Sequence, residues 1–178
     1  MGFVVIDEIF DKYDNKADLP EGADFFEFAE PNVRNFVMRD RNHPSIVLWS
    51  VGNEISEVET NSNGGFKKLQ AMVVNFKKYD ATRPITLVCH IADAAKKRHF
   101  DFYDVTAYNY RRQYKIAHDI EPSKPSLIGE SASTVSTRGF YELPLPKVKT
   151  DFTRAIQVSS YDLNAPEWAE IPDFDFMW

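Results

Sequence analysis

The sequence IVLWSVGNE occupies residues 46–54 and carries the main signal for the fold. Its first six residues are apolar on both faces of an extended chain, which is typical of a strand in a parallel sheet that is covered on both sides. Gly52, Asn53 and Glu54 end the run and bring polar side chains to the point where the strand stops. We therefore expect a buried parallel strand with functional groups at its carboxyl end.

Similar strand patterns recur along the chain and alternate with helical stretches. The predicted strands are 3–6, 46–51, 84–89, 104–108 and 125–129, and the predicted helices are 24–41, 66–78, 92–97 and 112–118. Such alternation indicates parallel βα units and an α/β fold. The pattern alone leaves a doubly wound sheet and a (β/α)8 barrel open. Pro31 lies in the middle of the first helix, where we expect a break or a fresh start.

Composition excludes several classes of protein. The chain has 178 residues, 43% of them hydrophobic and 27% charged, which is typical of a globular protein. A net charge of -6 argues against nucleic-acid binding, and no apolar run approaches the about 20 residues that span a bilayer. The lone Cys89 cannot form an internal disulfide and is expected to be a small buried residue. The compartment stays open: periplasmic, secreted and cytoplasmic locations all fit.

Polar residues collect at the carboxyl ends of the predicted strands. They are Asp7, Glu8, Asn53, Glu54, His90, Asn109, Tyr110 and Glu130. Parallel α/β folds build their active sites at this edge. Two carboxylates facing each other across a cleft are what glycoside hydrolysis requires. The alternative is that each strand-end acid caps the helix that follows it.

Several segments together resemble glycoside hydrolase family 2, the group of β-galactosidases, β-glucuronidases and β-mannosidases. The strongest match is RDRNHPSIVLWSVGNE at residues 39–54, which is similar to the family signature. The segments 2–8, 80–86, 104–110, 127–133 and 159–162 resemble further parts of the family's barrel. The resemblance therefore covers nearly the whole chain.

The resemblance implies a role for particular residues. Glu54 is similar to the family's acid/base, Glu130 to its nucleophile, Tyr110 to the tyrosine that hydrogen-bonds the nucleophile, and Asn53 to the asparagine that contacts the sugar 2-hydroxyl. We expect Asn109, His90 and Asp7 to contribute to substrate binding as well. No cofactor is implied, and no metal is expected, because residues 9–13 lack the histidine that some relatives use for magnesium. His43 is expected to be structural, and His99 and His118 are expected on the surface.

The resemblance also implies that the chain is an incomplete catalytic domain. Its five strands are similar to strands three to seven of an eight-stranded barrel. On this interpretation residues 1–135 form the barrel core, and residues 136–178 form a long loop or tail before an eighth strand. Unpaired strand edges favour association with other chains. Expressed alone, the chain is therefore expected to be marginally stable or to self-associate through its open barrel edges.

The predicted function is that of a retaining exo-β-glycosidase of the β-galactosidase type, with a carbohydrate substrate and no nucleic-acid or membrane partner. β-Glucuronidase and β-mannosidase activities are alternatives within the family. A different alternative is a fragment or carbohydrate-binding remnant that keeps both acids without turning over substrate. An endo-acting cellulase of the same clan shares the Asn-Glu and late Glu pattern, but the run at residues 39–45 argues against it.

Overall fold

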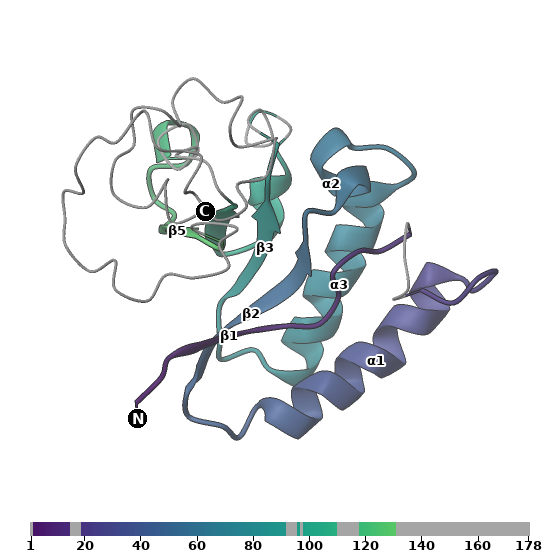
Figure 1. The fold of residues 1–178 in the computed structure, drawn as a ribbon, viewed down its shortest axis with the longest axis horizontal. Coiled ribbons are helices and arrows are strands. Elements are labelled where there is room, and N and C mark those ends of the chain that lie inside the picture. The colour runs from purple at the N-terminus through teal and green to yellow at the C-terminus, as the bar shows by residue number, and fades with distance from the viewer. Residues whose placement is uncertain (1, 15–18, 92–95, 97, 110–117, 131–178) are drawn as a thin grey trace, which may run out of the picture.

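The computed structural model describes residues 2–14, 19–91, 96, 98–109 and 118–130. Its elements in chain order are β1 (Val5–Glu8), α1 (Phe25–Asp40), β2 (Ile46–Asn53), α2 (Ser56–Thr60), α3 (Gly65–Tyr79), β3 (Ile85–Cys89), the 3-10 helix η2 (His99–Phe102), β4 (Val105–Tyr108) and β5 (Ser126–Ile128). The described strands pair in parallel in one sheet of five, as Figure 1 shows in part.

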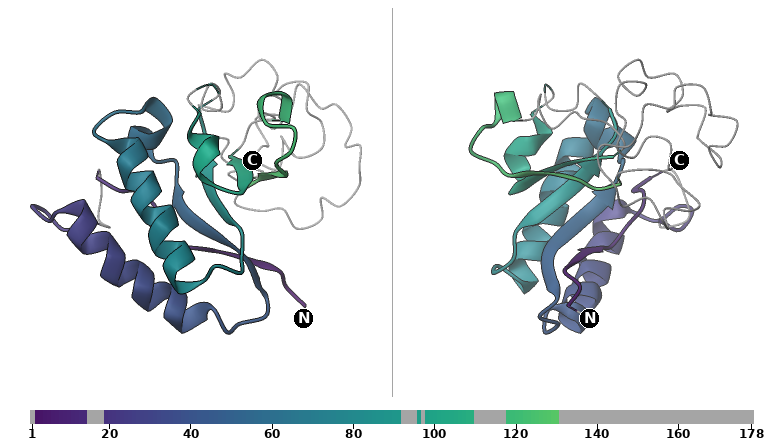
Figure 2. Two further views of the ribbon diagram at one scale, coloured as in Figure 1. Left: turned by 180° about the vertical axis from the view of Figure 1, so that it is seen from behind. Right: turned by 60° about the vertical axis from the view of Figure 1, so that its left-hand side comes forward.

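The order of the strands decides between the two candidate folds. In space they follow the order β1-β2-β3-β4-β5, the same as in the sequence. A doubly wound sheet reverses its strand order at a switch point. A barrel adds each new strand beside the previous one, and right-handed crossovers then carry all helices to one face. The described residues therefore form part of a (β/α)8 barrel, with α1 and α3 lying together outside the sheet (Figure 2).

The core lies between the sheet and these two helices. Trp49 of β2 is fully buried and contacts the rings of Phe36 on α1 and Phe76 on α3 at centroid distances of 5.7 and 5.9 Å. Ile85 and Leu87 of β3 point into the same cluster. Because side chains alternate along a strand, the residues between them face the opposite side, which is the inside of the barrel.

Helix α1 is continuous, so the expected break at Pro31 is wrong. Asp24 begins the helix by accepting hydrogen bonds from the second and third helical N–H groups. Pro31 removes one later hydrogen bond, at a local cost of about 3 kcal/mol. The residues Ala29, Val33 and Val37, spaced four apart on one face, are all fully buried. Their packing against the core outweighs the cost of the proline.

Asp80 ties the sheet to the turn after α3. This buried carboxylate accepts hydrogen bonds from the Trp49 indole at 3.1 Å, from Thr82 and from Arg83 at 2.6 Å. Burial raises the pKa of Asp80, but the donated hydrogen bonds outweigh burial and hold that pKa well below its usual value. Arg83 also donates to the backbone oxygen of Ile46, so the same cluster fixes the start of β2.

Two local features differ from the sequence expectations. The segment 56–60 forms the short helix α2, which was not predicted. His99 was expected on the surface, but it is fully buried in η2 and hydrogen-bonded to Tyr103 at 2.8 Å. Cys89 is buried beside it, as expected. Most of the helices predicted at 92–97 and 112–118, and all of the tail at 136–178, lie outside the described residues.

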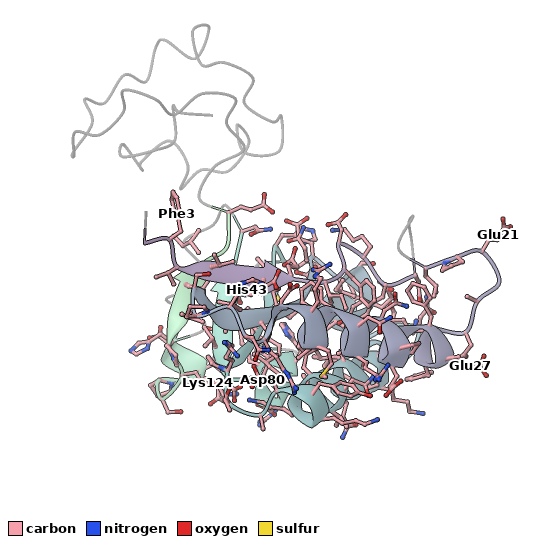
Figure 3. All side chains as sticks on the ribbon, turned by 90° about the horizontal axis from the view of Figure 1, so that it is seen from below. Phe3, Glu21, Glu27, His43, Asp80 and Lys124 are labelled. Atoms are coloured by element: carbon pink, nitrogen blue, oxygen red, sulfur yellow. The ribbon has the colours of Figure 1, made fainter. Side chains whose placement is uncertain are left out.

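Several apolar side chains are exposed on the surface of the described chain. Phe3 projects away from the described chain near its amino-terminal end (Figure 3), and its neighbour Val4 is exposed as well. Val47 and Ile128 add further exposed apolar area on β2 and β5. Across the described ranges, no helix has the length and apolar character needed to cross a bilayer.

Candidate active site

A pocket lies at the carboxyl ends of the strands, on the face of the sheet opposite α1 and α3. The residues that line it are Ile6, Glu8, Asn53, Val88, Asn109, Gly129 and Glu130. They come from β1, β2, β3 and the segments that follow β4 and β5. Strand-end residues that are far apart in the sequence therefore meet at one edge of the sheet, as the parallel βα pattern predicts.

Asn109 joins the two predicted catalytic carboxylates. Its side-chain Nδ2 donates to Glu54 Oε1 at 3.0 Å, to Glu130 Oε1 at 2.9 Å and to Asn53 Oδ1 at 2.9 Å. Asn109 is fully buried, and its backbone N–H donates to the Cys89 carbonyl at 2.7 Å. These three acceptors fix the orientation of the amide, because a flipped amide would place Asn109 Oδ1 against three other oxygen atoms.

The shared nitrogen also limits the distance between the two carboxylates. Because each accepting oxygen lies about 3 Å from Nδ2, the Oε1 atoms of Glu54 and Glu130 are at most about 6 Å apart, which includes the about 5–5.5 Å typical of retaining glycosidases. Inverting enzymes need about 6.5–9.5 Å to admit a water molecule. The arrangement is therefore compatible with direct attack by one carboxylate on a sugar carbon, with the other placed for proton transfer.

Glu54 is held in a strained backbone conformation. Its φ of 51° lies in the left-handed region, which costs about 1–3 kcal/mol for a residue other than glycine. The surroundings maintain it: Glu54 N–H donates to the Val88 carbonyl at 2.8 Å, and Lys12 Nζ donates to the Asn53 carbonyl at 2.7 Å. Asp11 accepts from Asn53 Nδ2 at 3.0 Å. The loop after β1 thus holds Asn53 by hydrogen bonds to both the backbone and the side chain of Asn53.

Gly129 leaves the space that Asn109 needs. A Cβ atom at this position would come within 2.5 Å of Val88 Cγ1 and 2.8 Å of Asn109 Oδ1. Any larger residue would therefore displace the bridging amide or the β3 side chain. The glycine that directly precedes Glu130 therefore leaves the Asn109 amide free to contact both carboxylates.

His90 lies beside Glu54 but is held by another carboxylate. Its Nδ1 is 3.0 Å from Glu59 Oε2 and 3.9 Å from Glu54 Oε2. Glu59, on α2, is fully buried. The Glu59 carboxylate beside the ring raises the pKa of His90 above its usual 6.5, against the opposing effect of burial.

The two acids at the end of β1 face opposite sides of the sheet. Asp7 is in register with Trp49 and interacts with Asp40 at the end of α1, and burial together with that second carboxylate raises the pKa of Asp7. Glu8 is in register with Ser50, accepts its hydroxyl at 2.6 Å and lines the pocket. Burial raises the pKa of Glu8. The structure thus brings Glu8 to the site in place of Asp7.

Most of the predicted site residues lie together at the carboxyl ends of the strands. They are Asn53, Glu54, His90, Asn109 and Glu130. Tyr110 lies outside the described residues. Glu59 was missed because α2 is too short to show helical periodicity. Lys12 was missed because a charged residue in a loop gives no signal of its own. In the described ranges, no three His, Cys, Asp or Glu side chains are grouped to hold a metal, and the expectation of a metal-free site remains a prediction.

The fold and the site define part of an α/β barrel that carries acidic groups at the carboxyl ends of its strands. The family model described as "Glycosyl hydrolases family 2, TIM barrel domain" matches residues 2–160. The chain belongs to glycoside hydrolase family 2, and it comes from the catalytic barrel of that family.

Individual relatives agree with this assignment. A β-galactosidase of Bacteroides ovatus is 31% identical over 81% of this chain, and a putative β-glucuronidase of Formosa agariphila is 32% identical over 79%. The crystal structure of a family 2 member from Bacteroides cellulosilyticus has a TM-score of 0.58 at 32% identity, covering 74% of this chain and 17% of that protein. The chain spans 21% of the Bacteroides ovatus relative and 12% of the Formosa agariphila relative.

Proposed function

We propose that the chain carries the catalytic centre of a retaining exo-β-glycosidase that hydrolyses terminal β-linked sugars by double displacement. The observation that supports this most directly is the bridge from Asn109 Nδ2 to both Glu54 and Glu130, at 3.0 and 2.9 Å. It holds two carboxylates at a separation suited to retention. Membership in glycoside hydrolase family 2 supports the proposal independently.

In the first displacement Glu130 attacks the anomeric carbon and forms a glycosyl ester. Glu54 gives its proton to the leaving oxygen, so the departing alcohol is neutral and Glu54 becomes a carboxylate. In the second displacement Glu54 takes a proton from water as that water attacks the anomeric carbon, and Glu130 is released. Two inversions give net retention. Asn53 and Asn109 orient the two acids, and Tyr110 is proposed to hydrogen-bond the nucleophile.

For the substrate we propose a β-galactoside, since the Bacteroides ovatus relative with 81% coverage of this chain is named a β-galactosidase. Other relatives are named β-glucuronidases, so β-glucuronides are the first alternative, followed by β-mannosides. The pocket residues near the reaction centre serve the chemistry that all three sugars share, so they do not decide among these substrates.

The test is turnover of aryl β-galactosides, β-glucuronides and β-mannosides by the complete gene product. We expect Glu130→Gln to abolish hydrolysis and Glu54→Gln to slow it by about 10²–10⁴-fold on substrates with poor leaving groups. Glu21→Gln is the matched control, since Glu21 is exposed on a loop (Figure 3). Absence of turnover and of any covalent adduct would favour the alternative, a catalytically incompetent chain.

We also propose that residues 1–178 alone self-associate. Within the described sheet β1 and β5 are the edge strands, and Phe3, Val4 and Ile128 are exposed near them. Exposed strand edges with apolar side chains pair readily with other chains. Sedimentation of residues 1–178 should give a mass that rises with concentration. A monomer that unfolds in one cooperative transition would contradict the proposal.

A further inference from the structure

Glu59 is a fully buried carboxylate outside the proposed catalytic pair. It sits on α2, and its Oε1 accepts the backbone N–H groups of His90 at 2.6 Å and Ile91 at 3.3 Å. Its Oε2 lies 3.0 Å from His90 Nδ1. Burying a charge is costly unless it is paired and hydrogen-bonded, and Glu59 meets both conditions through His90 and Ile91, which directly follow β3.

The same ring nitrogen of His90 lies near Glu54. His90 Nδ1 is 3.9 Å from Glu54 Oε2, so it stands between the buried carboxylate and the proposed acid/base. The side chain of His90 is 33% exposed, whereas that of Glu59 is not exposed at all. The charged groups facing His90 are Glu59 from α2, Glu54 from the end of β2 and Lys12 from the loop after β1. Two of these three favour the imidazolium and Lys12 opposes it.

We propose that Glu59 and His90 form a positioning pair for Glu54, in which Glu59 keeps the imidazole charged and the imidazolium stabilises the Glu54 carboxylate. This inference rests on the proposed function, because it assigns the pair to the acid/base step. When Glu54 gives its proton to the leaving oxygen, a negative charge develops on Glu54, and His90 compensates it without giving up its own proton. The pair neither bonds to substrate nor changes the balance of the reaction.

The pair would be most useful where proton donation limits the rate. A substrate with a poor leaving group needs full proton transfer from Glu54, whereas an activated aryl leaving group needs little. Loss of the imidazolium should therefore slow the first kind of substrate more than the second. A purely structural role of His90 would slow both equally.

The first experiment follows the NMR titration of the His90 ring in four forms of the complete gene product: wild type, Glu59→Gln, Glu54→Gln and Glu57→Gln. Because Glu59 is the main cause of the raised pKa of His90, Glu59→Gln should lower that pKa. Glu54→Gln should lower it by less, given the longer distance. Glu57 is also buried on α2, but it accepts from the Asp14 N–H instead, so Glu57→Gln should leave the titration unchanged.

The second experiment compares kcat/KM against pH for substrates with good and poor leaving groups. Because the imidazolium favours the carboxylate form of Glu54, loss of its charge in Glu59→Gln should move the alkaline limb to higher pH for the poor leaving group. Glu57→Gln should not move it. Glutamine retains an acceptor for the two backbone N–H groups, so the end of β3 should keep its structure. If Glu59→Gln does not fold, the titration of His90 in Glu54→Gln alone tests whether the His90 ring interacts with Glu54.

The outcomes separate this inference from the proposed function. An unchanged His90 titration in Glu54→Gln, or an unchanged alkaline limb in a folded Glu59→Gln enzyme, would overturn the positioning pair and leave the proposed function intact. A wild-type protein that hydrolyses none of the aryl glycosides would overturn the proposed function and, with it, the role of the pair in catalysis. The coupled titrations would then report only an electrostatic contact.

Discussion

Replacing Asn109 by alanine removes a donor that the two proposed catalytic carboxylates share. The amide carries two protons and faces three acceptors, Asn53 Oδ1 at 2.9 Å, Glu54 Oε1 at 3.0 Å and Glu130 Oε1 at 2.9 Å. Two full hydrogen bonds are therefore the most it can supply at once. A hydrogen bond to a charged group contributes about 1.5–3 kcal/mol, so the upper limit of the loss is about 3–6 kcal/mol.

Water entering the space left by the amide recovers part of this free energy. We take about 2–4 kcal/mol as the net loss in transition-state stabilisation, which corresponds to a decrease in kcat/KM of about 30- to 1000-fold. The assay is kcat/KM on the best aryl β-glycoside, with unfolding in denaturant measured in parallel to confirm a folded variant. Asn42→Ala is the control, because Asn42 is exposed in the turn before β2. A folded Asn109→Ala enzyme within about threefold of wild type would refute the reasoning.

Three further predictions concern stability and its dependence on pH. Gly129→Ala should lower the unfolding free energy by about 1–3 kcal/mol and reduce activity, since its Cβ would lie 2.5 Å from Val88 Cγ1; unchanged denaturation curves would contradict this. Asp80→Asn should cost about 3–5 kcal/mol near neutral pH, because it breaks a buried pair with Arg83. Because folding lowers the pKa of Asp80, its carboxylate stabilises the folded protein above the ordinary pKa of 3.8. That stabilisation is lost as pH falls through the lower pKa of the folded state, so the difference in unfolding free energy between Asp80→Asn and wild type should narrow in acid. His90→Gln should destabilise the protein more below pH 6.5 than at alkaline pH, because the raised pKa of His90 gives stabilisation that is lost as pH rises through that pKa. Equal losses of unfolding free energy at the two pH values would argue against a charged His90.

The elements with strong patterns were predictable from the sequence. The apolar run at residues 46–51 became part of β2, and the stripe at 66–78 became α3. In each segment the spacing of the apolar residues reflects which side chains are buried against the core, so the sequence alone shows it. The choice between a barrel and a doubly wound sheet was not contained in that periodicity. It came from the family resemblance, and the sequential strand order is consistent with it.

Features that depend on a single contact were not predictable. Asp7 and Glu8 are adjacent acids, and each shares its face of β1 with one apolar residue, so alternation does not indicate which acid faces the pocket. The register with Trp49 and Ser50 settles it. Glu59 gives no local sign of burial either, because what stabilises it is the end of β3, about thirty residues further along the chain.

The assignment of Glu54 and Glu130 themselves rested on the match to the family signature. Strand-end position made each of them a candidate, but helix capping explained a single strand-end acid equally well. The structure adds a physical reason to consider them together, since one buried amide contacts both. That contact required residues from the ends of three different strands, which no local pattern reports.

The most direct measurement is covalent trapping of the complete gene product with a 2-deoxy-2-fluoro β-glycoside that has an activated leaving group. The fluorine slows both displacements, and the activated leaving group lets the glycosyl ester accumulate. We predict one added sugar per chain, mapped to Glu130 by peptide mass spectrometry and absent from Glu130→Gln. A sugar mapped to another residue, or hydrolysis of the parent glycoside without any trapped ester, would contradict a double displacement at Glu130.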